Sequence, residues 1–202
     1  MKKIIIFTIA VLFMATAAQA AEPYEPYGGK FNYMTFSLGG YWPSEDLDDE
    51  GYKSGADFTF SYMRSMQKWY GVGAGAHMYA SQSNTAPGYV GDGDFGSLGI
   101  EMLFYMQPNH WQIQPYFGIG PAIYYNFLTY DVGVNEEKID KSGVGLGGVF
   151  KVGLRAFLTK QFFCGMSLKG FSNSWNLDVG ENQDKTLNFG GSVVAFELGF
   201  TF

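Results

Sequence analysis

Eight stretches of the chain alternate apolar with small or polar residues, and this period of two constrains the fold more than any other feature of the sequence. Successive side chains of a β-strand point to opposite faces, so each stretch predicts a strand with one apolar face. The predicted strands are residues 31–42, 55–65, 69–81, 94–106, 111–125, 143–158, 162–173 and 186–202. In the last of them one face carries Val194, Phe196, Leu198, Phe200 and Phe202, and the other carries Ala195, Glu197, Gly199 and Thr201.

The connections between the predicted strands alternate between short and long. The short ones are residues 66–68, 107–110 and 159–161, and the long polar ones are residues 43–54, 82–93, 126–142 and 174–185. Each strand also reaches the roughly 9 to 11 residues that a tilted strand needs to cross a bilayer. The sequence therefore predicts an all-β fold, an eight-stranded antiparallel up-and-down transmembrane β-barrel, with the short turns at its periplasmic end and the long loops at its outer end.

The first twenty residues have the layout of a cleaved signal peptide. Lys2 and Lys3 precede an apolar run, and the small-x-small pattern of Ala18 and Ala20 follows it. The run is too short to span a membrane as a helix, so we expect residues 1–20 to be removed during secretion.

The mature chain then divides into two parts. Residues 21–30 contain two prolines, which argue against a ninth strand, and we expect them to form an extended periplasmic lead-in. Residues 31–202 form the predicted barrel domain. Both termini are expected on the periplasmic side.

Charge and cysteine content exclude other classes of protein. Without Lys2 and Lys3, 11 basic side chains stand against 19 acidic ones, a formal net charge of −8. Such an acidic chain is not expected to bind nucleic acid. Cys164 is the single cysteine, so an internal disulfide framework is excluded.

Glycine placement indicates which face of each strand points inward. Small residues follow the polar face, where the narrow interior of an eight-stranded barrel has to accommodate large rings such as Tyr33, Tyr79 and Tyr116. We therefore expect the apolar face to point outward. Aromatic residues near the strand ends would then form interfacial girdles: Trp42, Tyr70, Trp111 and Tyr125. Trp69 and Trp175 fall on the inward parity and make this girdle incomplete.

At this point the chain resembles a known class of protein. Its last strand, with alternate apolar residues ending on Phe202, is similar to the carboxy-terminal strand that outer-membrane proteins present to the barrel-assembly machinery. The whole layout resembles the small eight-stranded barrels of Gram-negative bacteria, the class of OmpX, OmpW and the membrane domain of OmpA. The resemblance implies the bacterial outer membrane as location, and an assembly signal at Phe196, Leu198, Phe200 and Phe202. It does not imply one function, because this class includes adhesins, channels, stabilising proteins and enzymes.

Six charged residues fall on the inward parity and form the candidate site: Asp57, Glu101, Lys151, Arg155, Lys169 and Glu197. Three acids and three bases in a poorly solvated interior are expected to pair with one another. Counting from the strand ends places Glu101, Arg155 and Glu197 at one shallow depth and the other three deeper. The resulting network is expected to plug the lumen, and the alternative is a gate that rearranges to admit ions or small solutes.

Two histidines and an acidic loop carry weaker signals. His77 has inward parity and is expected to be a hydrogen-bonded interior residue rather than a catalyst. His110 falls in a predicted turn and receives no role. The segment from Glu45 to Asp57 approximates the spacing of a calcium-binding loop, but its twelfth position is Asp57 instead of the bidentate Glu, so we expect a solvated acidic loop and no specific metal site.

The segment from Lys169 to Trp175 resembles the strand end that carries the His-x-Ser-Asn motif of outer-membrane lipid A deacylases. Ser172 and Asn173 match that motif, but Gly170 occupies the histidine position. A serine without a base is a poor nucleophile, and Asp184 as an acid does not replace one. We expect a structural strand exit.

Three functions therefore stay open. The leading hypothesis is a non-enzymatic outer-membrane barrel with a structural or surface-displaying role, without cofactors. The alternatives are a narrow channel for small or apolar solutes and a lipid A modifying enzyme. The partners expected are outer-membrane lipids, lipopolysaccharide and, during biogenesis, the assembly machinery. The oligomeric state is left open by the sequence.

Overall fold

The computed structural model describes residues 25–44, 52–83, 93–132, 137–178 and 184–202. The signal peptide predicted at 1–20 lies outside these residues, as do the first part of the lead-in and residues 45–51 of the acidic loop. No helix in the described part of the chain is long and apolar enough to cross a membrane.

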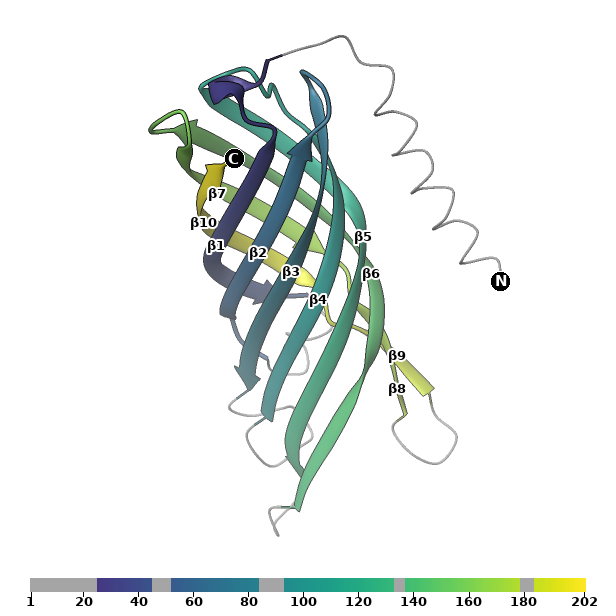
Figure 1. Cartoon of the computed structure of the whole chain (residues 1–202). Coiled ribbons are helices and arrows are strands. Elements are labelled where there is room, and N and C mark those ends of the chain that lie inside the picture. The colour runs from purple at the N-terminus through teal and green to yellow at the C-terminus, as the bar shows by residue number, and fades with distance from the viewer. Residues whose placement is uncertain (1–24, 45–51, 84–92, 133–136, 179–183) are drawn as a thin grey trace, which may run out of the picture.

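The described elements are one 3-10 turn and ten strands (Figure 1). In chain order they are η1 (Tyr27–Gly29), β1 (Asn32–Pro43), β2 (Gly55–Ser65), β3 (Tyr70–Ser83), β4 (Gly93–Met106), β5 (Ile113–Val132), β6 (Glu137–Phe157), β7 (Phe162–Phe171), β8 (Ser174–Asp178), β9 (Asp184–Asn188) and β10 (Gly191–Thr201).

Eight of these strands close into a barrel. The sheet runs β5-β4-β3-β2-β1-β10-β7-β6, and β6 pairs with β5 to complete the ring. All pairings along this ring are antiparallel. Closure leaves no unpaired edge in this ring, which is the condition for a sheet to cross a membrane. The predicted fold class is confirmed.

The two ends of the barrel differ (Figure 1). At one end, the turn end, the chain makes the short connections between β2 and β3, β4 and β5, and β6 and β7; η1 and Phe202 lie at this end as well. At the opposite end, the loop end, β8 and β9 form a hairpin that joins the wall through the pairing of Ser174 with Leu146.

Two predicted long loops are wrong in part. The loop predicted at 126–142 is mostly strand, because β5 and β6 stay paired as far as Val132 and Glu137. The polar residues of this segment predict a loop, but β5 and β6 continue beyond the barrel as a paired hairpin (Figure 1). The loop predicted at 174–185 contains β8 and the start of β9.

The described part of the lead-in is not simply extended. Gly28 and Gly29 adopt φ values of 75° and 72°, a region that glycine enters without steric cost, and they form the turn η1. The N–H of Tyr27 donates to the carbonyl of Asn109 at 2.8 Å, and its ring packs on Phe157 with 4.9 Å between centroids. These contacts hold the lead-in against the turn end.

The strand faces point as predicted. Apolar side chains on the outer face are largely exposed, including Leu38 at 66%, Ile100 at 66% and Phe196 at 51%. The inner face is buried, and glycines there make room for rings. A Cβ at Gly99 would lie 2.3 Å from the ring of Tyr124, so only glycine fits beside that tyrosine.

The predicted girdle needs one correction. Trp42, Trp111 and Tyr125 are about half exposed, as expected for outward aromatics. Trp69 was assigned to the inward face, but it is 52% exposed and its ring lies 6.0 Å from that of Trp111. It sits in the turn before β3, where the alternation of a strand does not apply. Trp175 is buried, in agreement with its parity.

Candidate functional site in the barrel interior

The first charged group of the interior joins β6 and β10. Lys151 Nζ lies 2.6 Å from Oε1 of Glu197, and Arg155 Nε donates to Oε2 of Glu197 at 3.3 Å. The hydroxyl of Tyr116 donates to Oε1 at 2.7 Å, and its ring lies 4.1 Å from the Arg155 guanidinium. The guanidinium also donates to Gln107 Oε1 at 3.2 Å. The carboxylate of Glu197 is therefore fully surrounded by donors.

A glycine allows this group to form. In the strand register, Gly165 of β7 pairs with Arg155 of β6 on one side and with Glu197 of β10 on the other. Its position faces inward but carries no side chain, so Arg155 can reach across β7 to the carboxylate.

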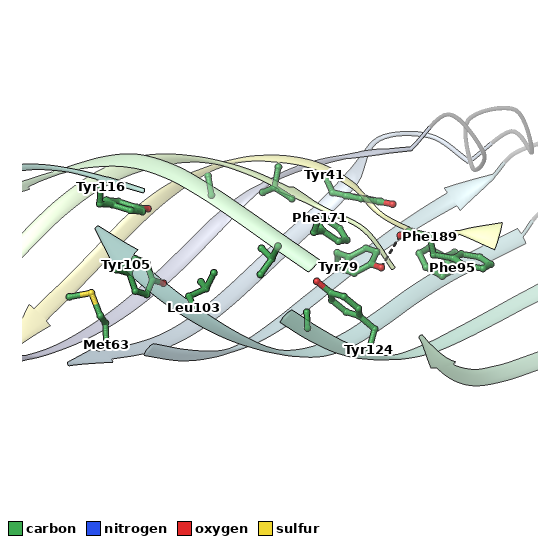
Figure 2. Close-up of a cluster of buried hydrophobic side chains, with 14 of the residues drawn as sticks. Tyr41, Met63, Tyr79, Phe95, Leu103, Tyr105, Tyr116, Tyr124, Phe171 and Phe189 are labelled. Atoms are coloured by element: carbon green, nitrogen blue, oxygen red, sulfur yellow. Dashed lines mark hydrogen bonds between the residues drawn. The ribbon is translucent and has the colours of Figure 1, made fainter. Parts of the chain in front are cut away.

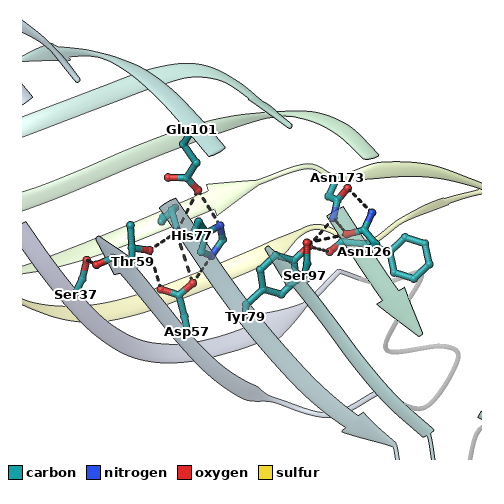
Figure 3. A network of polar contacts seen from close by, with 11 residues as sticks. Ser37, Asp57, Thr59, His77, Tyr79, Ser97, Glu101, Asn126 and Asn173 are labelled. Carbon is teal, nitrogen blue, oxygen red and sulfur yellow. Dashed lines mark hydrogen bonds and ion pairs between the residues drawn. The ribbon is translucent and has the colours of Figure 1, made fainter. Parts of the chain in front are cut away.

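The second charged group lies on β2, β3, β4 and β7 (Figure 3). His77 Nε2 contacts Oδ2 of Asp57, and Nδ1 lies 2.8 Å from Oε1 of Glu101. Lys169 Nζ lies 3.4 Å from the same oxygen of Glu101 and 3.6 Å from Oδ2 of Asp57. It also donates to Thr59 Oγ1 at 3.0 Å. Two carboxylates thus share one ammonium and one imidazole.

All six predicted residues are buried in the interior, but not in the predicted layers. Glu101 was placed at the depth of Arg155 and Glu197, whereas it contacts Lys169 and His77. Lys151 was placed deeper, whereas it contacts Glu197. Strands of a barrel are tilted and staggered, so counting residues from each strand end does not give depth along the barrel axis.

Sequence reasoning missed His77 as a member of the second group. The signal was present, because His77 and Asp57 both have inward parity, but only the register places them together. Asp57 pairs with Tyr79, two residues along β3 from His77, and the His77 ring stacks on that of Tyr79 at 4.9 Å.

An uncharged network lies beside the second group (Figure 3). Asn173 Nδ2 donates to Asn126 Oδ1 at 2.6 Å and to the hydroxyl of Tyr79 at 2.7 Å. The hydroxyl of Ser97 donates to Asn126 Oδ1 at 2.7 Å. Asn188 Oδ1 accepts from the backbone N–H of Asn173 and of Gly190. The side chain of Asn188 thus accepts backbone N–H groups that a ladder would use. The predicted strand 162–173 ends at Phe171, and the predicted strand 186–202 is divided between β9 and β10.

Aromatic rings occupy the interior from this network to the loop end (Figure 2). Tyr79 packs against Tyr41 and against Phe171, each with 4.8 Å between ring centroids. Further toward the loop end, Phe189 lies 4.9 Å from Phe95 and 5.1 Å from Trp175. The hydroxyl of Tyr79 donates to the carbonyl of Phe189 at 2.9 Å. The interior is therefore a packed core with charged and aromatic layers.

The deacylase-like segment lacks the groups of a hydrolase. Ser172 faces outward, and its Oγ accepts from the backbone N–H of Gly148 at 3.0 Å. Asn173 faces inward and belongs to the network described above. The two histidines of the chain lie elsewhere: His77 is in the lumen, and His110 packs between Trp69 and Trp111 at the turn end. No imidazole is near Ser172 to take its proton.

Among the described residues, no group of three or more His, Cys, Asp or Glu is arranged to hold a metal ion. Asp57, the described end of the calcium-like segment, points into the barrel and contacts His77. The other acidic positions of that segment lie outside the described residues.

The predicted assembly signal lies on the outer face of β10. Phe196, Leu198 and Phe202 are about half exposed. Phe200 packs between Phe162 at 6.4 Å and Phe202 at 5.8 Å.

Three solved structures are similar to this one. They are neisserial surface protein A (TM-score 0.51, 14% identity, covering 85% of this chain and 97% of that one), Ail of Yersinia pestis in complex with the heparin analogue sucrose octasulfate (0.51, 15%, 85% and 99%), and OprG from Pseudomonas aeruginosa (0.56, 15%, 88% and 97%). At such identities the likeness shows the fold alone. No curated protein matches the chain by sequence.

The sequence pattern of one protein family matches nearly the whole chain. Residues 6–200 match the outer membrane protein beta-barrel domain. The closed ring of strands, the outward apolar face and the charged interior are in keeping with this match. The chain belongs to the family of outer-membrane β-barrel proteins.

Proposed function

We propose that this protein is a closed, non-enzymatic barrel of the bacterial outer membrane, whose loop end is displayed outside the cell. The observation that carries the proposal is the filling of the interior by side chains that contact one another across the lumen. Arg155 and Lys151 reach Glu197, and Lys169 reaches Asp57 and Glu101. An eight-stranded barrel is just wide enough for its own side chains to fill.

The pairing of these charges supports a plug over a gate. To open a water path, Lys151 and Arg155 would have to leave the carboxylate of Glu197. Breaking a buried ion pair by removing one partner costs about 3 to 5 kcal/mol, because a charge is left uncompensated. The aromatic layer of Tyr79 and Phe171 would have to move as well.

The absence of a base at Ser172 supports a non-enzymatic role. The lipid A deacylase hypothesis requires an imidazole beside the serine hydroxyl, and both histidines of the chain are placed elsewhere. Mass spectrometry of lipid A from cells with and without the protein tests this point. We expect identical acyl patterns, and a missing acyl chain would contradict the proposal.

The difference between the two ends of the barrel supports one orientation in the membrane. Outer-membrane barrels have short periplasmic turns and longer outer loops, so the turn end, with η1 and Phe202, is assigned to the periplasm. Ser54 is exposed at the loop end. We expect a membrane-impermeant maleimide to label Ser54→Cys in intact cells of a Cys164→Ser background. Exposed Lys160 of the turn end, replaced by Cys, is the matched control and should stay unlabelled.

The outer face of β10 supports recognition by the barrel-assembly machinery. Phe196, Leu198 and Phe202 project from one face of the last strand, where another protein can contact them before the barrel closes. We expect Phe202→Ser to lower the amount of folded barrel in the membrane. If Phe202→Ser and the unmodified protein give equal amounts of folded barrel, Phe202 is not needed for recognition by the assembly machinery.

Conductance decides between the plug and the channel. We expect the refolded barrel to show no discrete current steps in a planar bilayer, and the double variant Tyr79→Ala, Phe171→Ala to stay silent as well, because both charged groups still fill the lumen. Phe150→Ala, which removes an outward ring from β6, is the matched control and should stay silent. If the unmodified protein shows current steps and their size changes in Lys151→Gln, the plug hypothesis is wrong and the protein is a channel.

A further inference from the structure

The outer wall has a groove where β5, β6 and β7 meet. It is lined by Ile119, Gly148, Phe150, Gly170 and Ser172 and has a volume of about 550 Å³, within the range of small-ligand sites. Gly148 and Gly170 stand at outward positions: Gly148 lies between Leu146 and Phe150 on its strand, and Gly170 follows Leu168 and precedes Ser172. Two missing side chains in an otherwise continuous apolar surface therefore form the depression.

The fold does not require a glycine at position 148. A Cβ built on Gly148 meets no atom closer than 3.7 Å, the carbonyl oxygen of Gly120. At Gly170 a Cβ would lie 2.7 Å from the ring of Phe150, so that glycine is needed for packing. Glycine inside a strand is unfavourable on its own. The glycine at position 148 keeps the groove open, because any larger side chain there would enter it.

The groove has one polar group. Ser172 Oγ accepts the N–H of Gly148, and within the described part of the chain its own hydrogen has no acceptor. On the outer face of this segment, apolar Met166 and Leu168 precede Ser172, and polar Ser174 follows it. Along this segment the hydroxyl therefore stands where apolar outward residues give way to polar ones, while on the neighbouring β6 the apolar surface continues at Leu146, the partner of Ser174.

The strand register and the length of β7 give a second indication of where Ser172 lies relative to the membrane. Gly170 pairs with Ser192, and Ser192 pairs with Trp42. Trp42 is an outward aromatic, 45% exposed, of the kind that sits at the membrane interface. Ser172 is also ten residues beyond Phe162, where β7 begins at the turn end, and a tilted strand needs about 9 to 11 residues to cross a bilayer, so its hydroxyl lies on the outer side, where acyl chains join a lipid headgroup through carbonyl groups.

We propose that this groove binds one acyl chain of lipid A, with a linkage carbonyl accepting a hydrogen bond from Ser172. The chain lies over Gly148, between Ile119 and the ring of Phe150 that covers Gly170. This inference rests on the proposed function for its choice of lipid, because a loop end outside the cell faces the leaflet that contains lipopolysaccharide. Binding involves no reaction, since Ser172 has no base.

Native mass spectrometry of the detergent-folded barrel with purified lipid A tests the proposal. We expect one lipid A bound per barrel, and at least fivefold weaker binding to Gly148→Leu, whose side chain fills the groove. Val144→Leu adds an outward methylene to the same strand outside the groove and should bind like the unmodified protein. Gly148→Ala, for which the structure has room, gives a second, milder variant if the leucine prevents folding.

A second arm uses phosphatidylglycerol instead of lipid A. Equal binding of both lipids would overturn the assignment to lipid A. Equal lipid A binding by Gly148→Leu, Gly148→Ala and the unmodified protein would show that the lipid does not bind in this groove. The measurement in detergent does not depend on the orientation of the barrel. A failure of the proposed orientation is detected separately, by the labelling of Ser54→Cys.

Discussion

Lys151 of β6 and Lys169 of β7 stand directly opposite each other in the antiparallel ladder, and both side chains enter the lumen. Like charges at such positions repel each other. The two ammonium groups are directed to different carboxylates: that of Lys151 to Glu197 and that of Lys169 to Glu101 and Asp57. The division of the interior into two charged groups follows from this pair.

Replacing Glu197 with Gln is expected to destabilise the barrel strongly. Lys151 and Arg155 would lose their shared carboxylate, and leaving buried charge unpaired costs about 3 to 5 kcal/mol. Urea unfolding of the detergent-folded barrel, followed by tryptophan fluorescence, measures the change in the free energy of unfolding. Lys160→Gln changes an exposed charge and should stay within about 0.5 kcal/mol. Equal midpoints for both variants would show that the first charged group does not stabilise the fold.

Two substitutions at His77 are expected to differ. His77→Leu removes both contacts of the ring and leaves Lys169 as the only ionic partner of Asp57 and Glu101 among the described residues, so a loss of about 3 to 5 kcal/mol is expected. His77→Gln keeps a donor for one carboxylate, and we expect about 1 to 3 kcal/mol. Thermal unfolding, read from the gel mobility of folded and unfolded barrel, ranks them. His110→Gln is the control, and equal melting of the Leu and Gln variants would argue against the described pairing.

The contact between Gly99 and Tyr124 predicts a rescue. Gly99→Ala places a methyl group against the tyrosine ring, and such overpacking costs about 1 to 3 kcal/mol. In a Tyr124→Leu background the same substitution should cost less than about 0.5 kcal/mol. A double-mutant cycle of unfolding free energies measures the coupling. Gly148→Ala is the matched control, because its methyl group would meet no atom closer than 3.7 Å, and additive effects of the two changes would contradict the predicted clash.

Tryptophan fluorescence can locate the girdle. We expect lipids brominated in their acyl chains to quench a variant that retains only Trp69, whose side chain is 52% exposed. A variant that retains only Trp175, which is 6% exposed, should be quenched far less. Steady-state emission in vesicles with and without bromine measures both. Strong quenching of Trp175 would place that residue outside the barrel, against the described packing with Phe189.

Much of the fold was predictable from the sequence, because the two faces of a strand appear as an alternation of apolar and polar residues within the strand itself. In β10 the alternation of Val194, Phe196 and Leu198 with Ala195 and Glu197 depends only on the period of the backbone. The same holds for the inward parity of His77 and Lys169. The inference failed at Trp69, which sits in a turn and faces outward, and at residues 126–132 and 137–142, which remain paired beyond the barrel.

The sequence by itself therefore determined the strands, their faces, the closed barrel and the set of charges inside it. Only the tertiary structure decided which charges meet, because tilt and stagger shift each strand along the barrel axis relative to its neighbours. That shift separates Glu101 from Arg155 and brings His77 to Asp57. The break between β9 and β10 was decided there too, because the side chain of Asn188 accepts the backbone N–H groups of Asn173 and Gly190, which local periodicity assigns to the ladder.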